Sequence, residues 1–340
     1  MTCILPNAEL PRLRHALLGW YEEHRRELPW RADADPYRVW VSEIMLQQTR
    51  VAAVLEHYAR FIKRFPTVQS LASARGQSVL AAWSGLGYYH RARRMHQAAK
   101  VIVRERQGVF PSTSAEWLEL PGIGRYTAAA IASIAFGEAV AVVDGNVERV
   151  LARLSGLAMQ NGKAWGQAEA LLDRARPGDF NQGMMELGAT LCTPRTPQCL
   201  LCPLSPWCRT RGEHRVSEPP TRKRKHLCCA LVQRENAVLL VQRPKYARLM
   251  ADMWELPIIE ESAQKSAPLL FTLRHSITDT DYTISVLQTT EYEVGNSAWF
   301  TPKQWERLAL TGLARKILRK LESRRMSRGH AAVNLNSRKT

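Results

Sequence analysis

The sequence lacks a long apolar run, an internal repeat and a low-complexity tract. Its most apolar stretch, residues 128–143, is interrupted by Gly137 and Glu138, and a helix needs about 20 apolar residues to cross a bilayer. The first 30 residues carry charges throughout and no apolar core of signal-peptide length. These absences exclude a fibre and argue against a membrane or exported protein, so a cytoplasmic location is expected.

Cysteine is scarce outside one short segment. Three of the seven cysteines, Cys3, Cys228 and Cys229, are scattered along the chain, while the other four lie within seventeen residues. An odd number in this arrangement does not resemble a disulfide framework. The four clustered residues therefore need a different explanation.

Acidic residues are few compared with basic ones. The 340 residues include 48 Lys and Arg but only 31 Asp and Glu, which gives a net charge of +17. Such a balance usually indicates a polyanionic partner, either nucleic acid or an acidic membrane surface. However, residues 209–225 carry +5 and residues 315–340 carry +8, so net charge alone does not establish a nucleic-acid groove.

The length and the pattern of apolar residues predict two domains. Residues 8–208 have helical spacing, with expected helix starts at Asp35-Pro36, Thr49 and Asp144. A basic linker is expected over 209–226, a smaller α/β domain over 227–322 and a basic disordered tail over 323–340. Strands are expected at 227–232, 237–241, 282–287 and 298–300, with helices after Pro302.

The strongest chemical signal is the spacing Cys-x6-Cys-x2-Cys-x5-Cys, formed by Cys192, Cys199, Cys202 and Cys208. Thiolates bind zinc or iron–sulfur clusters. Only one CxxC pair is present, and Pro203 follows Cys202, so the pattern favours one [4Fe–4S] cluster over a zinc ribbon. Zinc and four unrelated buried cysteines remain alternatives.

A second signal is Leu-Pro-Gly-Ile-Gly-Arg-Tyr-Thr-Ala at residues 120–128. It predicts a helix–hairpin–helix at about 114–136, in which Gly122 and Gly124 allow the turn to approach a partner. Backbone N–H groups at the second helix can then bind a phosphate without reading sequence. An ordinary helical hairpin is the alternative, but Val-Asp-Gly-Asn at 143–146 follows closely and strengthens the first interpretation.

The hairpin, Asp144 and the cysteine spacing together resemble the endonuclease III superfamily of DNA glycosylases. Leu-Pro-Trp-Arg at 28–31, Ser-Glu-Ile-Met-Leu-Gln-Gln-Thr at 42–49 and Gly-Leu-Gly-Tyr-Tyr at 85–89 resemble the MutY adenine glycosylases. The resemblance covers nearly all of residues 8–208. It implies an all-α glycosylase domain that carries an iron–sulfur cluster.

Two carboxylates fit the chemistry that the resemblance implies. Breaking an N-glycosidic bond requires an acid for the departing base and a negative charge for the cationic sugar. Glu43 has apolar neighbours on both sides, so desolvation should raise its pKa and keep it protonated. Asp144 begins a helix, where the free N–H groups favour an anion. The alternatives are a solvated helix face for Glu43 and a simple helix cap for Asp144.

Tyr126 separates two subclasses of this superfamily. In bifunctional members the equivalent residue is a Lys that forms a Schiff base and cleaves the strand, which a Tyr cannot do. The resemblance implies that Tyr126 and Asn146 orient Asp144 and the substrate. It also implies that Arg31 and Gln182 contact the flipped adenine, while Trp30 forms a wall of its pocket.

A base in a duplex must leave the stack before such a pocket can bind it. The resemblance implies that Gln48 and Tyr88 fill the resulting gap, and that Thr49 and Leu86 lie beside the opposite base. Loop and core packing are the alternatives for these residues. Residues 84–104 carry a net charge of +5, which favours phosphate contacts nearby.

The C-terminal domain resembles the MutT-like module of MutY enzymes, although no metal-binding Gly-x5-Glu-x7-Arg-Glu-x2-Glu-Glu string is present. The resemblance implies that it recognises 8-oxoguanine opposite the adenine. The corresponding loop is Ile277-Thr278-Asp279, in which Thr278 keeps a hydroxyl and Asp279 replaces a His of the family pattern. This departure makes the strength of 8-oxoguanine discrimination an open question.

The combined features predict a monofunctional adenine DNA glycosylase of base-excision repair. Its expected partner is double-stranded DNA with an 8-oxoguanine·A or G·A mispair, and the chain is expected to act as a monomer. A cation at the helix–hairpin–helix is a further possibility. The alternatives are an endonuclease III-like lyase, a catalytically silent DNA-binding or redox-sensing protein, and a MutT-type hydrolase, which the absent metal helix disfavours.

Overall fold

A computed structural model describes residues 4–159, 162–211, 221–247, 249–260, 262, 267–290, 292 and 295–336, without the side chains of 325–336. The chain divides into two compact units. The first comprises Met1–Ser73 and Arg94–Glu218, and the second comprises Ala74–Arg93 and Pro219–Thr340. No helix among the described residues is long and apolar enough to cross a membrane.

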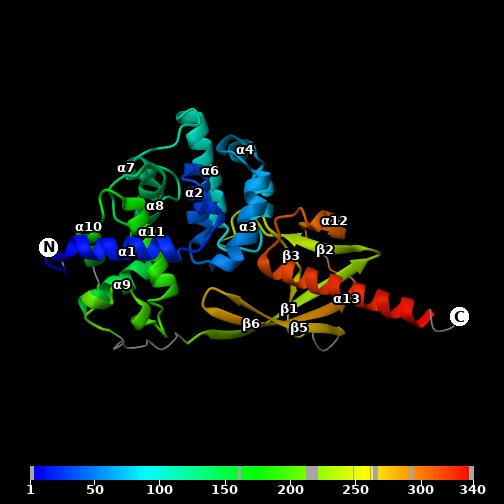
Figure 1. Ribbon diagram of the computed structural model, residues 1–340. Helices are drawn as coiled ribbons and strands as arrows, with labels where there is room; N and C mark the ends of the chain where they lie inside the picture. Colours follow the sequence, from blue (N-terminus) through cyan, green and yellow to red (C-terminus); the bar gives the residue numbers. More distant parts are fainter. Residues whose placement is uncertain are drawn as a thin grey trace. The chain divides into compact units, whose positions relative to one another are not determined.

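The first unit is helical (Figure 1). Its elements are α1 (Leu10–His24), η2 (Pro29–Arg31), α2 (Pro36–Leu46), α3 (Val51–Arg64), α4 (Val68–Ser73), α6 (His90–Glu105, which begins in the second unit), α7 (Ser114–Leu118), α8 (Arg125–Phe136), α9 (Gly145–Ser155), α10 (Lys163–Leu171) and α11 (Pro177–Thr190), with short η1 (Asn7–Glu9), η3 (Cys199–Leu201) and η4 (Ser205–Trp207).

Helix α11 lies at the centre of this unit and packs against α1, α8 and α9. One apolar core joins α1, α9, α10 and α11 and includes Leu13, Leu17, Leu151 and Phe180. On the other side, α2 packs against α8. Ala129 and Ala130 of α8 are buried in a small apolar cluster with Val142. Helix α8 therefore contacts both α2 and α11, and α9 packs against α11.

Local sequence signals explain where the important helices begin. The Asp35 carboxylate accepts a hydrogen bond from the Arg38 backbone N–H at 2.8 Å, and Pro36 occupies the first turn of α2. Thr113 and Glu116 form a capping box at the start of α7. These observations confirm the expected helix start at Asp35-Pro36 and the expected pair of helices around Pro121.

The second unit contains a mixed seven-stranded sheet. Its strands are β1 (Lys223–Arg234), β2 (Ala237–Gln242), β3 (Trp254–Glu255), β4 (Ile258–Ile259), β5 (Leu269–Ile277), β6 (Thr280–Thr289) and β7 (Ser297–Phe300). The main order is β3-β2-β1-β6-β5, with β4 paired to β1 and β7 paired to β2. The β1–β6 pair is parallel and the other pairs are antiparallel.

Besides the start of α6, the described residues of this unit include the helices α5 (Gly76–Trp83), α12 (Pro302–Trp305) and α13 (Gly312–Asn336). Its apolar core includes Leu240, Ile284 and Ile317. The sequence analysis placed residues 74–93 in the helical domain, but they group with the sheet. Within this unit the Ser84 hydroxyl donates to the Leu310 carbonyl at 2.6 Å, which explains the grouping.

Two expected boundaries need correction. The linker expected to reach residue 226 ends earlier, because β1 begins at Lys223 and pairs with β6 from Thr280 onward. The tail expected to be disordered from residue 323 is helical to Asn336 as part of α13, since its first turns pack on the sheet and no proline interrupts the residues that follow. Most of the remaining linker, and residues 337–340, lie outside the described residues.

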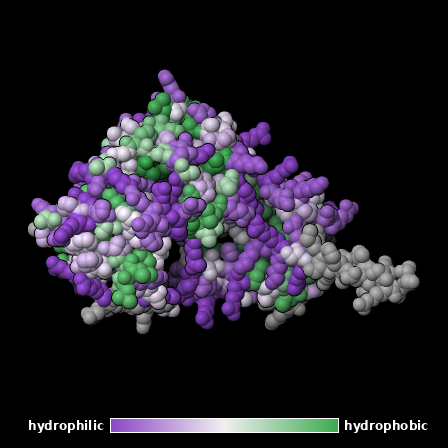
Figure 2. Space-filling view, in the orientation of Figure 1, coloured by the Kyte–Doolittle hydropathy of each residue, from purple (hydrophilic) through white to green (hydrophobic). Residues whose placement is uncertain are grey.

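Hydrophilic side chains predominate on the face shown in Figure 2. The large apolar side chains are mainly buried, including Trp40, Trp83 and Trp117. This distribution agrees with the apolar core of the helical unit and the apolar core of the sheet unit.

Candidate active site and cysteine pocket

Glu43 is a buried carboxyl group on α2, with an exposed fraction of only 6%. Its pKa is raised to about 7, mainly by burial and also by the negative charge of Asp144. A hydrogen bond from Tyr126 and the charge of Arg31 act in the opposite direction. Glu43 is therefore about half protonated near neutral pH and can donate a proton there.

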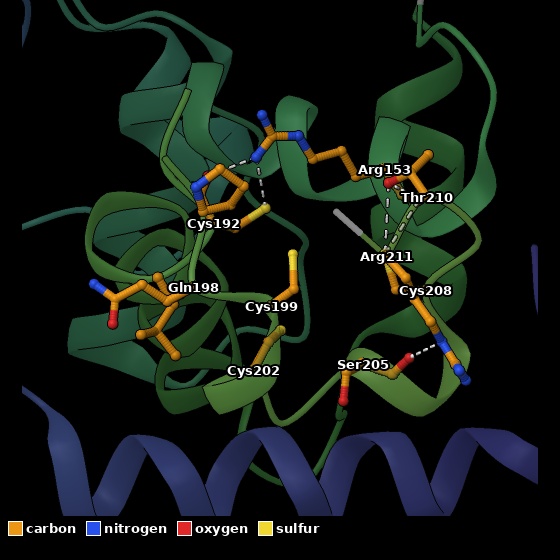
Figure 3. Close-up of a pocket in the computed structure, with 11 residues that line it drawn as sticks. Arg153, Cys192, Gln198, Cys199, Cys202, Ser205, Cys208, Thr210 and Arg211 are labelled. Atoms are coloured by element: carbon orange, nitrogen blue, oxygen red, sulfur yellow. Dashed lines mark hydrogen bonds between the residues drawn. The ribbon is translucent and has the colours of Figure 1, made fainter. Parts of the chain in front are cut away.

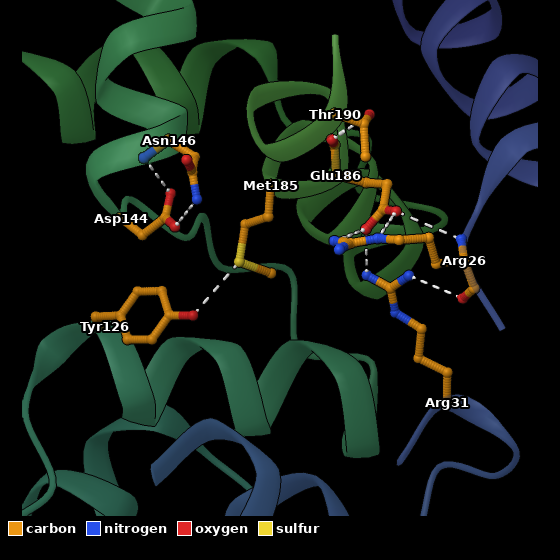
Figure 4. Close-up of polar contacts among 8 residues, drawn as sticks. All are labelled: Arg26, Arg31, Tyr126, Asp144, Asn146, Met185, Glu186 and Thr190. Atoms are coloured by element: carbon orange, nitrogen blue, oxygen red, sulfur yellow. Dashed lines mark hydrogen bonds and ion pairs between the residues drawn. The ribbon is translucent and has the colours of Figure 1, made fainter. Parts of the chain in front are cut away.

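Tyr126 lies on the first turn of α8 and faces Glu43. Its hydroxyl donates to Glu43 Oε2 at 2.7 Å. The same hydroxyl lies 3.4 Å from Met185 Sδ on α11 (Figure 4). Burial raises the pKa of Tyr126 well above its ordinary value, so the phenol stays neutral. It acts here as a hydrogen-bond donor rather than as a base.

Asp144 is the N-cap of α9, and its carboxylate is tightly fixed. Oδ1 accepts from the backbone N–H groups of Asn146 at 2.9 Å and Val147 at 2.7 Å. Oδ2 accepts from Asn146 Nδ2 at 2.8 Å. These donors stabilise the anionic form at the positive end of the helix, so capping and a charge-stabilising role are compatible in one residue.

Asn146 is fixed by a hydrogen bond from Arg149 and by the close approach of Gly188 on α11. Its Oδ1 accepts from Arg149 Nη2 at 2.8 Å, and Arg149 Nε donates to the Cys192 carbonyl at 2.9 Å. A Cβ added at Gly188 would lie 2.6 Å from Asn146 Cβ, so this position requires glycine. Arg149 could not be found from local spacing, because it connects α9 to Cys192, 43 residues further along the chain.

The residues expected to line an adenine pocket lie on η2 and α11. Trp30 is buried and packs edge-on against Tyr58, with ring centroids 5.2 Å apart. Arg31 Nη2 donates to Glu186 Oε2 at 2.9 Å. Gln182 lies one turn before Glu186 on α11 and is partly exposed. Arg26 and Glu186 were missed, although Glu186 follows two methionines much as Glu43 follows apolar residues.

Two candidate DNA contacts follow directly after α2. Gln48 has a left-handed backbone with φ of 55°, which is strained for a residue with a side chain. Thr49 Oγ1 donates to the Gln47 carbonyl at 3.2 Å, and Gln47 Nε2 donates to Thr127 Oγ1 on α8 at 3.1 Å. The loop that carries Gln48 is thereby attached to the hairpin helix.

The hairpin turn between α7 and α8 depends on Gly122. Its φ is 82°, and a Cβ there would lie 2.5 Å from the Arg94 side chain. Gly124 is the N-cap of α8 and has open space where a Cβ would be. The turn therefore needs glycine at 122, while Gly124 leaves the helix N-terminus uncovered. The cation expected at this hairpin stays a prediction.

The other candidate DNA contacts belong to the second unit. Leu86 is buried, whereas Tyr88 is 40% exposed and has φ of 46°. Thr278 is exposed in the β5–β6 turn and has φ of 51°. Gln48, Tyr88 and Thr278 thus share an uncommon left-handed backbone, which often marks functional positions.

The four clustered cysteines line one pocket, whose empty volume including its open side is about 360 Å³ (Figure 3). Arg153 Nη1 lies 3.3 Å from Cys192 Sγ. Burial raises the pKa of the Cys202 thiol to about 11, so metal binding would release its proton. Four thiols beside a cation fit an anionic iron–sulfur cluster. Among the described residues, however, no three His, Cys, Asp or Glu side chains are close enough to hold a single metal ion.

Comparison with known proteins gives the family. Residues 41–174 match the model for the HhH-GPD superfamily of base excision DNA repair proteins. The human adenine DNA glycosylase is 34% identical, with 92% of this chain and 74% of that protein covered. The chain belongs to the adenine DNA glycosylase family. It is therefore a DNA glycosylase of base-excision repair, which confirms the family and enzyme class expected from the sequence.

Other adenine DNA glycosylases are longer than the matched region. The rat protein is 48% identical over 63% of this chain and 45% of its own length. The Arabidopsis thaliana protein is 40% identical over 76% of this chain and 49% of its own length. A thermostable thymine-DNA glycosylase is similar in structure, with a TM-score of 0.57, 29% identity and coverage of 61% of this chain and 99% of that one. Endonuclease III in a non-covalent DNA complex shares the fold, with a TM-score of 0.52 and 22% identity. The match covers 59% of this chain and 96% of the endonuclease III chain.

Proposed function

We propose that this glycosylase hydrolyses the N-glycosidic bond of adenine paired with 8-oxoguanine or guanine in double-stranded DNA, without cutting the strand. The observation that carries the proposal is the buried Glu43, whose pKa is raised to about 7 beside the fixed carboxylate of Asp144. Glu43 can donate a proton near neutral pH, while the Asp144 carboxylate is held by three hydrogen-bond donors. The family supplies adenine as the target base.

The reaction uses the two carboxyl groups in sequence. Glu43 donates its proton to adenine, the C–N bond breaks, and the bonding electron pair leaves with the base. Asp144 stabilises the cationic sugar that remains. Water then attacks the anomeric carbon and gives a proton to the Glu43 carboxylate, which restores the starting state.

Tyr126 supports a hydrolytic rather than a lyase reaction. Its hydroxyl is neutral and donates to Glu43 at 2.7 Å. A phenol cannot form the Schiff base on which strand cleavage depends. The proposed product is therefore an intact strand with an abasic site.

The proposed roles in DNA binding follow the position and backbone of each residue. Trp30, Arg31 and Gln182 would bind the flipped adenine, while Gln48 and Tyr88 would fill the space that it leaves. The N-terminus of α8 after Gly122 and Gly124 would bind a backbone phosphate. Thr49, Leu86 and Thr278 would contact the opposite base, and Asp279 makes the degree of 8-oxoguanine preference a point for measurement.

Cys192, Cys199, Cys202 and Cys208 would hold one [4Fe–4S] cluster. The cluster would stabilise the loop that follows α11, because hydrolysis of the glycosidic bond requires no electron transfer. The pocket that the four residues share and the nearby Arg153 support this assignment. Iron, sulfide and zinc analysis of the purified protein tests it. About four irons per chain are expected, and an active protein that contains only zinc would contradict the assignment.

The function is tested with duplexes that carry one 8-oxoguanine·A, G·A or T·A pair. Free adenine should appear from the first two and not from T·A. Strand scission should appear only after alkali treatment. No release of adenine from either mispair would overturn the proposal, and scission before alkali would instead indicate a lyase.

A further inference from the structure

A buried ion-pair network lies beside the proposed adenine pocket. The Glu186 side chain is only 1% exposed. Its Oε1 accepts from Arg26 Nε at 2.5 Å, and its Oε2 accepts from Arg26 Nη2 at 3.0 Å and Arg31 Nη2 at 2.9 Å (Figure 4). One carboxylate therefore receives hydrogen bonds from two guanidinium groups.

Arg31 is the more buried of the two arginines in this network. The Arg31 side chain is 13% exposed, compared with 39% for Arg26. Arg31 Nη1 also donates to the Arg26 carbonyl at 3.2 Å, and its guanidinium lies 5.6 Å from the centre of the Tyr21 ring. Contacts at both terminal nitrogens and at the ring face define the plane of this group.

The same network is electrostatically connected to Glu43. Four influences act on the Glu43 carboxyl: burial and the charge of Asp144 raise its pKa, while the Tyr126 hydrogen bond and the charge of Arg31 lower it. The positive charge of Arg31 thus favours loss of the proton that Glu43 must donate. Although burial alone would raise the pKa of Glu186, its hydrogen bonds with Arg26 and the charge of Arg31 lower it, so Glu186 stays anionic and offsets the charge of Arg31.

We propose that Glu186 is a positioning residue that fixes the Arg31 guanidinium at the adenine pocket. The inference rests on the proposed function, because it assigns Arg31 to adenine and Glu43 to proton donation. Glu186 has two effects through Arg31. It sets the direction in which Arg31 meets the base, and it limits how strongly Arg31 favours loss of the Glu43 proton.

The first test is the pH dependence of adenine release by Glu186→Gln under single-turnover conditions. Gln keeps the size of the side chain and removes the charge that offsets Arg31, so the pKa of Glu43 should fall. Because the protonated acid is the active form, the pH at which activity declines should fall by about one unit, with about tenfold slower release at pH 7.5. An unshifted profile in a folded variant would overturn the proposal.

A second pair of variants separates this effect from a general loss of structure. In an Arg31→Met background, Glu186→Gln should leave the rate of adenine release below the pKa of Glu43 where Arg31→Met alone places it, because the group that Glu186 positions is gone. An equal fall of that rate in both backgrounds would contradict action through Arg31. The matched control is Glu255→Gln, which removes the charge of a Glu paired with Arg243 at 2.6 Å in the other unit and should not move the profile.

Glu186→Asp provides a further check if Glu186→Gln fails to fold. It keeps the negative charge but shortens the side chain, so the profile should stay in place while release slows about tenfold through misplacement of Arg31. A wild-type rate would count against the positioning role. Absence of adenine release from the unmodified protein would instead contradict the proposed function.

Discussion

Glu43 and Asp144 show how surroundings can give two carboxyl groups different chemistry. Glu43 lies buried on α2, which packs against α8, and its carboxyl group accepts a hydrogen bond from Tyr126 on α8. Asp144 accepts three hydrogen bonds at the start of α9. Desolvation favours the protonated acid at the first position, and the backbone donors favour the anion at the second. The environment therefore assigns the proposed roles.

The two parts of Asp144, its charge and its capping oxygen, can be separated by substitution. Asp144→Asn keeps an oxygen for the α9 N–H groups but removes the charge, whereas Asp144→Ala removes both. Both variants should release adenine at least about a hundredfold more slowly. Only the alanine variant should lose about 1 kcal/mol of unfolding free energy.

Single-turnover rates and urea unfolding measure these two effects. A near-wild-type rate for Asp144→Asn would show that the charge does not stabilise the sugar. Equal stability of the two variants would show that capping by Asp144 contributes little.

Tyr126→Phe tests the hydrogen bond to Glu43. The phenol lowers the pKa of Glu43 by donating to its carboxylate, so its removal should raise that pKa. Because the protonated form is active, adenine release should continue to a higher pH than in the wild type. A profile that moves to lower pH would contradict this assignment. The matched control is Tyr292→Phe, which removes a hydrogen bond to the Ile258 carbonyl in the second unit.

At the scale of elements, helix α13 covers the outer edge of the sheet. Strand β5 is the last strand in the order of the sheet. Its backbone carbonyls accept hydrogen bonds from three basic side chains of α13: Lys316 donates to Arg274 at 2.6 Å, Lys320 to Thr272 at 2.9 Å and Arg324 to Leu270 at 2.6 Å. Cationic side chains at four-residue intervals therefore occupy carbonyls that an added strand could use. Covering an edge in this way is a common protection against association.

A triple substitution of Lys316, Lys320 and Arg324 to Gln should expose this edge. The expected result is a larger fraction of dimers and aggregates in size-exclusion chromatography with light scattering. A control that changes three exposed basic residues elsewhere, Lys63, Lys303 and Arg307, should behave like the wild type. Equal association of both variants would indicate an effect of net charge alone.

Elements with local signals could be predicted from the sequence. Asp35-Pro36 marks the start of α2 because its capping interaction lies within four residues, and the β1–β2 hairpin follows from alternation around Glu235-Asn236. Strands β3 and β4 have two residues each and little pattern of their own. Most of β5 was missed because its burial alternates irregularly along an edge.

In the candidate site, too, only features with a local sequence signal could be predicted. The apolar neighbours of Glu43 lie on its own helix, so the local sequence is enough to indicate that this carboxyl group is buried. In contrast, Glu186 meets Arg26 across 160 positions and Arg31 across 155, and no local spacing predicts these pairs. Interactions between distant segments are set by helix packing, which single-sequence patterns do not contain.

For the whole molecule, the two compact units divide the proposed tasks. The first carries Glu43, Tyr126, Asp144 and the cysteine pocket, while the second carries Leu86, Tyr88 and Thr278. The net charge of +17 is consistent with a polyanionic partner for the complete chain. Under the proposed function, both units would contact the duplex from which adenine is removed.

The central claim is that Glu43 supplies the proton for the departing adenine. The most direct measurement is single-turnover release of adenine from an 8-oxoguanine·A duplex by wild type and Glu43→Gln across pH 5–9. The wild-type rate should decline as the pH rises through about 7, whereas the variant should be roughly 10²–10⁴ times slower and lack that decline. Wild-type speed in Glu43→Gln, with the same decline, would contradict the account.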